Sequence, residues 1–248
     1  MGEKEPRNLL FIALVGVLIL VSLAFIFMPQ KKSEAWTQSA ESKKATTAKV
    51  ATIPLVAFIG DSICAGAADE LKAHQRWPQM VSQQLKWFPY NACVGGSGYI
   101  NPGADGKSRY QQIFEEFSIK LKPAIIVVEG GQNDLFSVTV SEAIDATEIS
   151  KAACGLYALI RKDFPKAQLI VMTPFYGVSQ APPSMKAEEN AIMECAAKYN
   201  AKVISGVRKW LQDRPELVIA DQTHPNGAGH SLIAQKFVAW YTASGIKA

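Results

Sequence analysis

Five short apolar runs, each followed by a segment with helical spacing, constrain the fold of this chain more than any other feature. The runs cover residues 55–59, 91–94, 124–128, 168–173 and 202–205. The segments with helical spacing cover residues 77–87, 109–121, 141–163, 186–200 and 226–244. A parallel strand buried on both faces is typically a continuous apolar run, because helices cover its sheet on both sides. The alternation therefore predicts an α/β fold, a three-layer α/β/α sandwich with a five-stranded parallel sheet.

A longer apolar run, residues 9–28, precedes these segments and contains no charged residue. Twenty helical residues rise roughly 30 Å, about the thickness of the hydrocarbon core of a bilayer. A removed signal peptide is the alternative, but its apolar region is usually only about 7–15 residues long. We therefore expect one N-terminal transmembrane helix, with a membrane anchor at residues 1–28, a flexible linker at 29–52 and a folded domain at 53–248.

The orientation of this anchor does not follow from its flanking charges. Lys4 and Arg7 stand on one side, and Lys31 and Lys32 stand on the other. The positive-inside rule compares such basic residues and gives no decision here. An apolar run this close to the N-terminus is typical of a signal-anchor. We expect a single-pass protein of the cell membrane with its domain outside the cytoplasm.

The net charge of the chain is +4, but most of the surplus lies ahead of the expected domain. Residues 31–50 contain five lysines and two glutamates, which leaves +1 for everything from Ala51 onward. Binding to a nucleic-acid backbone depends on clustered lysine and arginine. The composition therefore predicts no nucleic-acid partner.

The four cysteines, at positions 64, 93, 154 and 195, do not have the spacing of a metal site. They can be four small buried apolar residues. If the domain is exported, the pairs Cys64–Cys93 and Cys154–Cys195 can instead form disulfides, because each pair falls on neighbouring elements of the expected fold. Both alternatives remain open at this point.

Polar segments follow several of the expected strands. They are residues 60–62, the glycine loop 95–98, residues 131–134, and residues 221–224 before the last helix. In sheets of this kind, ligands bind outside the carboxyl ends of the strands. We therefore expect all four segments to meet at one edge of the sheet.

Ser62, His224 and Asp221 in these segments are the residue types of a hydrolase site. A serine hydroxyl becomes a good nucleophile when a nearby base takes its proton. His224 can act as that base, and Asp221, three residues earlier, can orient the imidazole. The developing oxyanion would need donors, for which the N–H of Ser62, an N–H of the glycine loop and the amide of Asn133 are candidates. Each segment alone also occurs in ordinary loops. The prediction rests on the presence of all four segments in this order.

The four segments resemble the four sequence blocks of the SGNH hydrolase superfamily, the GDSL-type esterases and lipases. The resemblance extends over about residues 55–239, and the final block is similar to that of exported bacterial members. It implies a flavodoxin-like sandwich without metal or cofactor. It also implies that Ser62 is the nucleophile, His224 the base and Asp221 its partner. The oxyanion donors would be Ser62, Gly98 and Asn133, with Gly96 as the competitor of Gly98.

The expected function is therefore that of a serine hydrolase that cleaves carboxylic esters through an acyl-enzyme. The substrate would be a small-molecule or carbohydrate ester with a short acyl or acetyl group, because no extended apolar lid follows from the sequence. Two alternatives remain: an acyltransferase acting on a sugar hydroxyl, and a catalytically idle anchored binding domain. We expect a monomer. Glu129, at the end of the central strand, would be a paired structural acid or a substrate contact, whereas His74 and His230 have no expected role.

Overall fold

The computed structural model describes residues 52–67, 71–135 and 145–246. The expected anchor, the expected linker up to residue 51 and the first residues of the expected helix 141–163 lie outside these ranges. Within the described ranges, no helix is both long enough and apolar enough to cross a bilayer.

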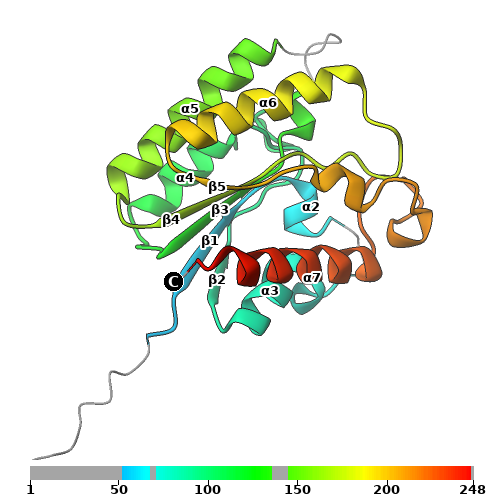
Figure 1. Ribbon diagram of the computed structural model, residues 1–248, viewed down its shortest axis with the longest axis horizontal. Helices are drawn as coiled ribbons and strands as arrows, with labels where there is room; N and C mark the ends of the chain where they lie inside the picture. Colours follow the sequence, from blue (N-terminus) through cyan, green and yellow to red (C-terminus); the bar gives the residue numbers. More distant parts are fainter. Residues whose placement is uncertain (1–51, 68–70, 136–144, 247–248) are drawn as a thin grey trace, which may run out of the picture. The chain divides into compact units, whose positions relative to one another are not determined.

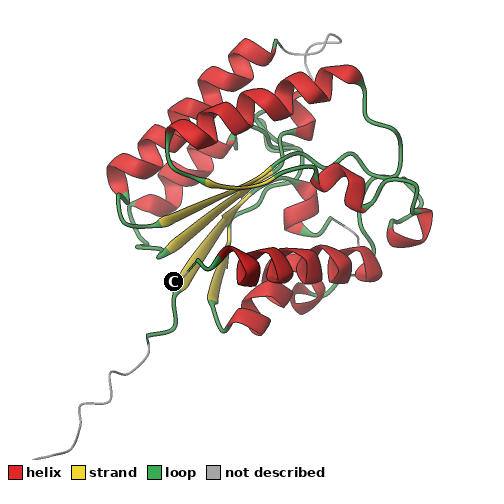
Figure 2. Cartoon of the chain, in the orientation of Figure 1, coloured by secondary structure: helices red, strands yellow, loops and turns green. Residues whose placement is uncertain are grey.

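A five-stranded parallel sheet forms the centre of the domain, as predicted (Figures 1 and 2). Its strand order is β2-β1-β3-β4-β5, an order typical of flavodoxin-like sheets. The three central strands are buried almost throughout, because helices cover both faces. The strands are β1 (Leu55–Ile59), β2 (Phe88–Asn91), β3 (Ile125–Glu129), β4 (Gln168–Met172) and β5 (Lys202–Ile204).

Helices pack on both faces of this sheet, which gives the three layers (Figure 1). The α-helices are α2 (Ser62–Ala65), α3 (Trp77–Leu85), α4 (Tyr110–Ser118), α5 (Ala146–Asp163), α6 (Pro183–Lys198) and α7 (Gly227–Ser244). The 3₁₀ turns are η2 (Ala73–Gln75), η3 (Gln132–Asp134), η4 (Val207–Trp210) and η5 (Pro215–Leu217). Helices α3 and α7 share one apolar core with the sheet, and α4, α5 and α6 share the other.

Aromatic side chains join α3 and α7 to the sheet in the first core. The ring of Trp77 packs edge-on against Phe58 of β1, with 5.5 Å between ring centroids. The same ring lies 5.7 Å from that of Phe237 on α7. All three side chains are fully buried, so they fix α3 and α7 relative to β1, the strand that precedes Ser62.

The second strand is the element that differs most from its predicted position. It covers Phe88–Asn91, whereas the apolar pattern predicted residues 91–94. The side chains of Phe88 and Tyr90 are exposed, and Pro89 lacks an N–H for the ladder. Proline is tolerated only because β2 is an edge strand. An exposed edge strand lacks the continuous apolar run that predicts a buried strand.

Two disulfides, Cys64–Cys93 and Cys154–Cys195, are present, and they are the pairs considered from the sequence. The first connects α2, which carries Ser62, to the segment that follows β2. The second connects α5 to α6, across a sequence separation of 41 residues.

Removing the second disulfide is expected to destabilise the domain without changing the catalytic edge. The variant with Cys154→Ala and Cys195→Ala should lose about 2–4 kcal/mol of unfolding free energy, because the unfolded chain regains the freedom of a long loop. Urea titration of this variant and of the wild type measures the difference. Equal unfolding midpoints under oxidising conditions would contradict the expectation.

Candidate active site

Ser62 stands at the carboxyl end of β1, in the first turn of the short helix α2. The Asp61 side chain caps this helix, because its Oδ1 accepts a hydrogen bond of 2.8 Å from the N–H of Ile63. Gly66 ends the helix in a left-handed conformation with φ of 75°, which glycine adopts without steric cost. The disulfide at Cys64 holds the other side of the same turn. The backbone around Ser62 is therefore fixed from both ends.

His224 and Asp221 belong to one tight loop ahead of α7. An isolated bridge between Val218 and Pro225 closes this loop. Within it, Asp221 Oδ1 accepts hydrogen bonds of 2.9 Å from the N–H groups of Thr223 and His224. These two bonds leave the second carboxylate oxygen of Asp221 to face the histidine ring.

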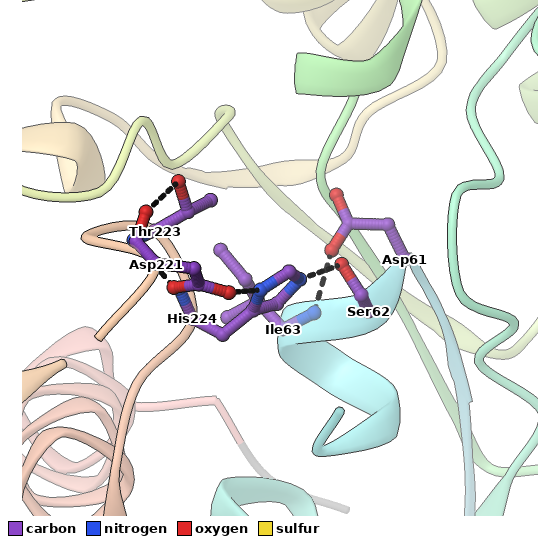
Figure 3. Close-up of polar contacts among 6 residues, drawn as sticks. All are labelled: Asp61, Ser62, Ile63, Asp221, Thr223 and His224. Carbon is purple, nitrogen blue, oxygen red and sulfur yellow. Dashed lines mark hydrogen bonds and ion pairs between the residues drawn. The ribbon is translucent and has the colours of Figure 1, made fainter. Parts of the chain in front are cut away.

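The three side chains form a continuous hydrogen-bonded series (Figure 3). His224 Nε2 lies 2.8 Å from Ser62 Oγ, across a separation of 162 residues. His224 Nδ1 lies 2.5 Å from Asp221 Oδ2. Burial raises the pKa of Asp221, but hydrogen bonds from the ring and from the two N–H groups outweigh burial and leave this pKa below its ordinary value. Asp221 is therefore ionised at neutral pH and can stabilise a positive charge on His224.

The glycine loop after β2 is held by a carboxylate to which sequence reasoning gave no role. Asp134, on η3, accepts hydrogen bonds from the N–H groups of residues 99, 100 and 101, at 2.7, 3.0 and 2.8 Å. Burial raises the pKa of Asp134 to about 6, although these three bonds oppose the change. A Cβ added at Gly98 would lie 2.2 Å from the same carboxylate. The Asp134 carboxylate therefore leaves no room for a side chain at position 98.

This arrangement does not support Gly98 as an oxyanion donor. Its N–H donates to the carbonyl of Asn101, at 3.0 Å, and is not available to a substrate. The N–H groups of Ser62 and Gly96, in contrast, have no acceptor within the described residues. A Cβ added at the neighbouring Gly95 would lie 3.9 Å from Ser62 Cβ, so this part of the loop is next to the nucleophile. The competing candidate, Gly96, fits the structure better than Gly98.

Asn133 lies at the same edge and lines a cavity of about 250 Å³. Its Nδ2 donates one hydrogen to the carbonyl of Ser97, at 3.0 Å. An amide nitrogen carries two hydrogens, so one remains for a ligand. The cavity is lined by side chains that can all form hydrogen bonds: Gln132, Asn133, Tyr176, Ser179 and Thr223.

Three further carboxyl groups are buried below this edge: Glu129, Asp61 and Glu188. Glu129 was expected to be a paired structural acid or a substrate contact, and its side chain is fully buried and forms no ion pair with another described residue. Burial raises the pKa of Glu129, and the nearby Asp61 carboxylate raises it further. Burial also raises the pKa of Asp61, to about 7, although the hydrogen bond from the N–H of Ile63 opposes this change. The Glu129 carboxyl fills space beneath Gly60, where an added Cβ would lie 2.6 Å from Glu129 Oε2.

The ionisation of the buried Glu188, on α6, can be tested through the pH dependence of stability. Burial, with the nearby carboxylates of Asp134 and Glu189, raises its pKa to about 9. The folded state therefore keeps a proton that the unfolded state releases near pH 4.5. Stability is lost as the pH rises from there through about 9.

The variant Glu188→Gln has no carboxyl group at this position, so its unfolding free energy should fall less as the pH rises. The wild type should lose at least about 1.4 kcal/mol more than the variant between mildly acidic and mildly alkaline pH, the free energy that corresponds to a difference of one in pKa. Urea titrations at both pH values measure this loss. The control is Glu194→Gln, an exposed acid on the same helix. Equal pH dependence in Glu188→Gln and the wild type would contradict the assignment.

The other two histidines do not take part in the hydrogen-bonded series of Ser62, His224 and Asp221. His230 is fully buried on α7, and its Nδ1 accepts a bond of 3.3 Å from the N–H of Trp77. Burial lowers its pKa to about 4, so it is neutral. His74 lies exposed on η2. Among the described residues, no group of three or more His, Cys, Asp or Glu is arranged to hold a metal ion.

Comparison with known proteins gives one family and a set of similar structures. Residues 58–232 match the model of the GDSL-like Lipase/Acylhydrolase family. A GDSL lipase of Mycobacterium tuberculosis is 27% identical over 190 residues, which cover 73% of this chain and 78% of that protein. The psychrotrophic esterase EstA from Pseudoalteromonas sp. has a TM-score of 0.62 at 14% identity, over 77% of this chain and 97% of that one. The salicylyl-acyltransferase SsfX3, from a tetracycline biosynthetic pathway, has a TM-score of 0.63 at 19% identity, over 79% of this chain and 56% of that one.

Proposed function

The chain belongs to the GDSL-like lipase/acylhydrolase family, and on this basis we propose that Ser62, His224 and Asp221 are the catalytic triad of a serine esterase. The single observation that carries the proposal is the contact of 2.8 Å between His224 Nε2 and Ser62 Oγ. A histidine at this distance can take the hydroxyl proton as the bond to the substrate forms. A binding domain without catalysis would not need Asp221 on the far side of the same ring.

The reaction proceeds through an acyl-enzyme in two matched halves. Ser62 Oγ attacks the carbonyl carbon of the ester, and its proton passes to His224 Nε2, while Asp221 stabilises the imidazolium. The tetrahedral intermediate then expels the alcohol, which takes this proton from His224. Water attacks the acyl-enzyme next and gives a proton to His224. That proton returns to Ser62 as the carboxylic acid leaves.

Three groups are proposed to stabilise the negative oxygen of the intermediate. They are the N–H of Ser62, the N–H of Gly96 and the free amide hydrogen of Asn133. Donors that are already in position cost no reorganisation during the reaction, and losing one typically lowers turnover by about 10²–10³. Gly96 therefore takes the role first expected of Gly98.

The cavity that Asn133 and Thr223 line favours a short acyl group over a long one. Its volume of about 250 Å³ is small, and the side chains that line it are polar. A long hydrocarbon chain would displace water from these polar side chains without replacing its hydrogen bonds, which is costly. We expect kcat/KM on nitrophenyl esters to be highest for acetate or propionate and to fall steadily toward decanoate. A maximum at octanoate or longer would contradict a short-acyl enzyme.

An acyltransferase is the second candidate, and the same cavity favours it. Polar groups such as Gln132 and Thr223 can hold the hydroxyl of an acceptor in the place of water, and the fold is similar to that of SsfX3. Turnover of an acetyl ester with and without a sugar alcohol in solution separates the candidates. A transferase forms the acetylated sugar and releases less free acetate, whereas an esterase releases the same acetate in both.

The enzyme is further proposed to be held at the membrane by residues 9–28, with its domain outside the cytoplasm. The charge-free run of twenty residues supports the tether, and the two disulfides support an oxidising compartment. A reporter that is active only in the cytoplasm, fused after Ala248, should be inactive. An active reporter would place the domain inside the cell.

A further inference from the structure

The near-neutral charge of the domain conceals an uneven distribution. Five exposed lysines lie where the chain leads into a strand: Lys86 before β2, Lys120 and Lys122 before β3, Lys166 before β4, and Lys202 at the start of β5. Because the strands are parallel, these positions lie at one edge of the sheet, opposite the catalytic edge (Figure 1). The last turns of α5 and α6 add Lys162 and Lys198. We call this surface the strand-start face.

The large apolar side chains that are exposed among the described residues are found at the same end of the domain. They are Ile53, Phe88, Tyr90 and Ile119, with exposed fractions of 67%, 62%, 39% and 81%. Phe88 donates its N–H to the carbonyl of Pro54, which places it next to Ile53. The ring of Tyr90 packs on Phe117 of α4, two residues before Ile119. The four residues therefore lie on neighbouring segments at this end of the domain, and Lys86, Lys120 and Lys122 are within three residues of Phe88 or Ile119 in the chain.

The two features have different physical explanations, and only their combination is informative. Lysines near the C-terminal ends of helices stabilise the helix dipoles, so the lysines alone would need no ligand. An isoleucine that is 81% exposed stabilises neither a helix end nor a core. Exposed apolar side chains rimmed by cations are typical of proteins that lie on anionic lipid, where the apolar groups enter the interface and the lysines face phosphates.

We propose that the strand-start face docks on an anionic phospholipid bilayer. The proposal rests on the tether at residues 9–28, because the chain enters the domain at this face, through Ile53 into β1. The sequence just ahead, residues 31–50, adds five lysines and only two glutamates. Each lysine close to such a surface strengthens binding by a factor of roughly five.

Docking in this orientation would determine which esters can reach the active site. The catalytic edge lies at the opposite ends of the strands, and a strand of five residues spans about 17 Å. Ser62 would therefore face away from the bilayer. The substrate would be an ester in the aqueous layer above the membrane and not an ester of a lipid within it.

Hydrogen exchange on the full chain tests the docking directly. The chain is placed in lipid nanodiscs of phosphatidylcholine alone, and in discs with roughly one third phosphatidylglycerol, which supplies the negative surface potential. Peptides that cover residues 86–90 and 117–124 should exchange more slowly in the anionic discs. Peptides that cover the loop 218–225 at the catalytic edge should exchange equally in both.

Variants separate docking from a general effect of charge. Lys120→Gln with Lys122→Gln should lower the ratio of docked to undocked domain about thirty-fold in anionic discs. The control, Lys107→Gln with Lys209→Gln, removes the same charge from exposed sites elsewhere and should have no effect. Phe88→Ser with Ile119→Ser should weaken docking in the same discs, and both side chains are exposed enough that folding should not depend on them.

The outcomes distinguish the docking from the tether. Equal exchange of residues 86–90 and 117–124 in both kinds of disc would overturn the docking and leave the tether standing. A chain that separates from both kinds of disc would overturn both. Retention only on anionic discs, lost in the Lys120 and Lys122 variant, would support docking and overturn the tether. Stronger protection of these peptides by a soluble anionic polysaccharide than by lipid would overturn the bilayer as the partner.

Discussion

Replacing Ser62 with alanine is expected to lower kcat on a short-chain ester by about 10⁵-fold or more, to a residual rate set by binding and the oxyanion donors. The reason is that His224 Nε2 lies 2.8 Å from this hydroxyl and from no other serine hydroxyl in the described residues. Alanine removes a single oxygen atom. The unfolding midpoint should therefore remain close to that of the wild type, so that the lost rate reports chemistry and not folding.

Ser179→Ala is the matched control for this substitution. Ser179 is exposed and lines the cavity next to Asn133, whereas the partner of His224 Nε2 is Ser62. Its loss should change kcat/KM by less than about ten-fold, the effect of one hydrogen bond to substrate. Steady-state kinetics on nitrophenyl acetate compare the two variants. Comparable losses in both, or more than a tenth of the activity left in Ser62→Ala, would contradict the assignment.

Asp221→Asn is expected to lower kcat by about 10⁴-fold with little change in structure. The asparagine oxygen can keep the bonds that Asp221 Oδ1 accepts from the N–H groups of Thr223 and His224. Its NH₂ group then takes the place of Oδ2 and donates to His224 Nδ1. The ring is forced to carry its proton on Nε2, where it can no longer accept the proton of Ser62.

The Asp221→Asn variant also tests whether the loss of kcat comes from the changed tautomer of His224. Hydrogen exchange in loop 218–225 should match the wild type, since both backbone hydrogen bonds remain. Asp163→Asn, a change at an exposed acid far from the site, should leave kcat unaltered. Wild-type kcat in Asp221→Asn would show that the contact of 2.5 Å between Asp221 and His224 has no catalytic role.

The central strands of the fold could be predicted because they are buried on both faces. The run at 55–59 matches β1 in full, and 124–128 and 168–173 differ from β3 and β4 by one residue. Strand β2 could not be located in the same way, since its side chains alternate between exposed and half-buried positions at the sheet edge. The helix α2 was missed because four residues are too few to show a helical period.

The candidate site could likewise be predicted only in part. Ser62, His224 and Asp221 could be identified from residue type, order and spacing, and the structure brings them into contact. The glycine of the oxyanion loop could not be identified, because which N–H is free depends on hydrogen bonds within the loop. Gly98 loses its N–H to Asn101. Asp134 sets this loop conformation, and its position next to Asn133 was the only sign of it in the sequence.

The buried acids and the strand-start face had no clear signal in the sequence. Of the other acids in the same helix, Glu194 is exposed and the buried Glu189 is ion-paired, whereas Glu188 is buried without a hydrogen-bond partner among the described residues. The lysines that precede the strands are spread over more than a hundred residues, and they gather only when parallel strands bring their starting ends to one edge. Net charge, which is what composition reports, averages over both edges.

Intact mass after reaction with a fluorophosphonate tests the central claim most directly, that His224 activates Ser62. An activated serine is the group that such a reagent modifies. We predict one adduct per chain, located on the peptide that contains Ser62, and none in His224→Ala. An adduct on another serine, or equal labelling of Ser62 in His224→Ala, would contradict the account.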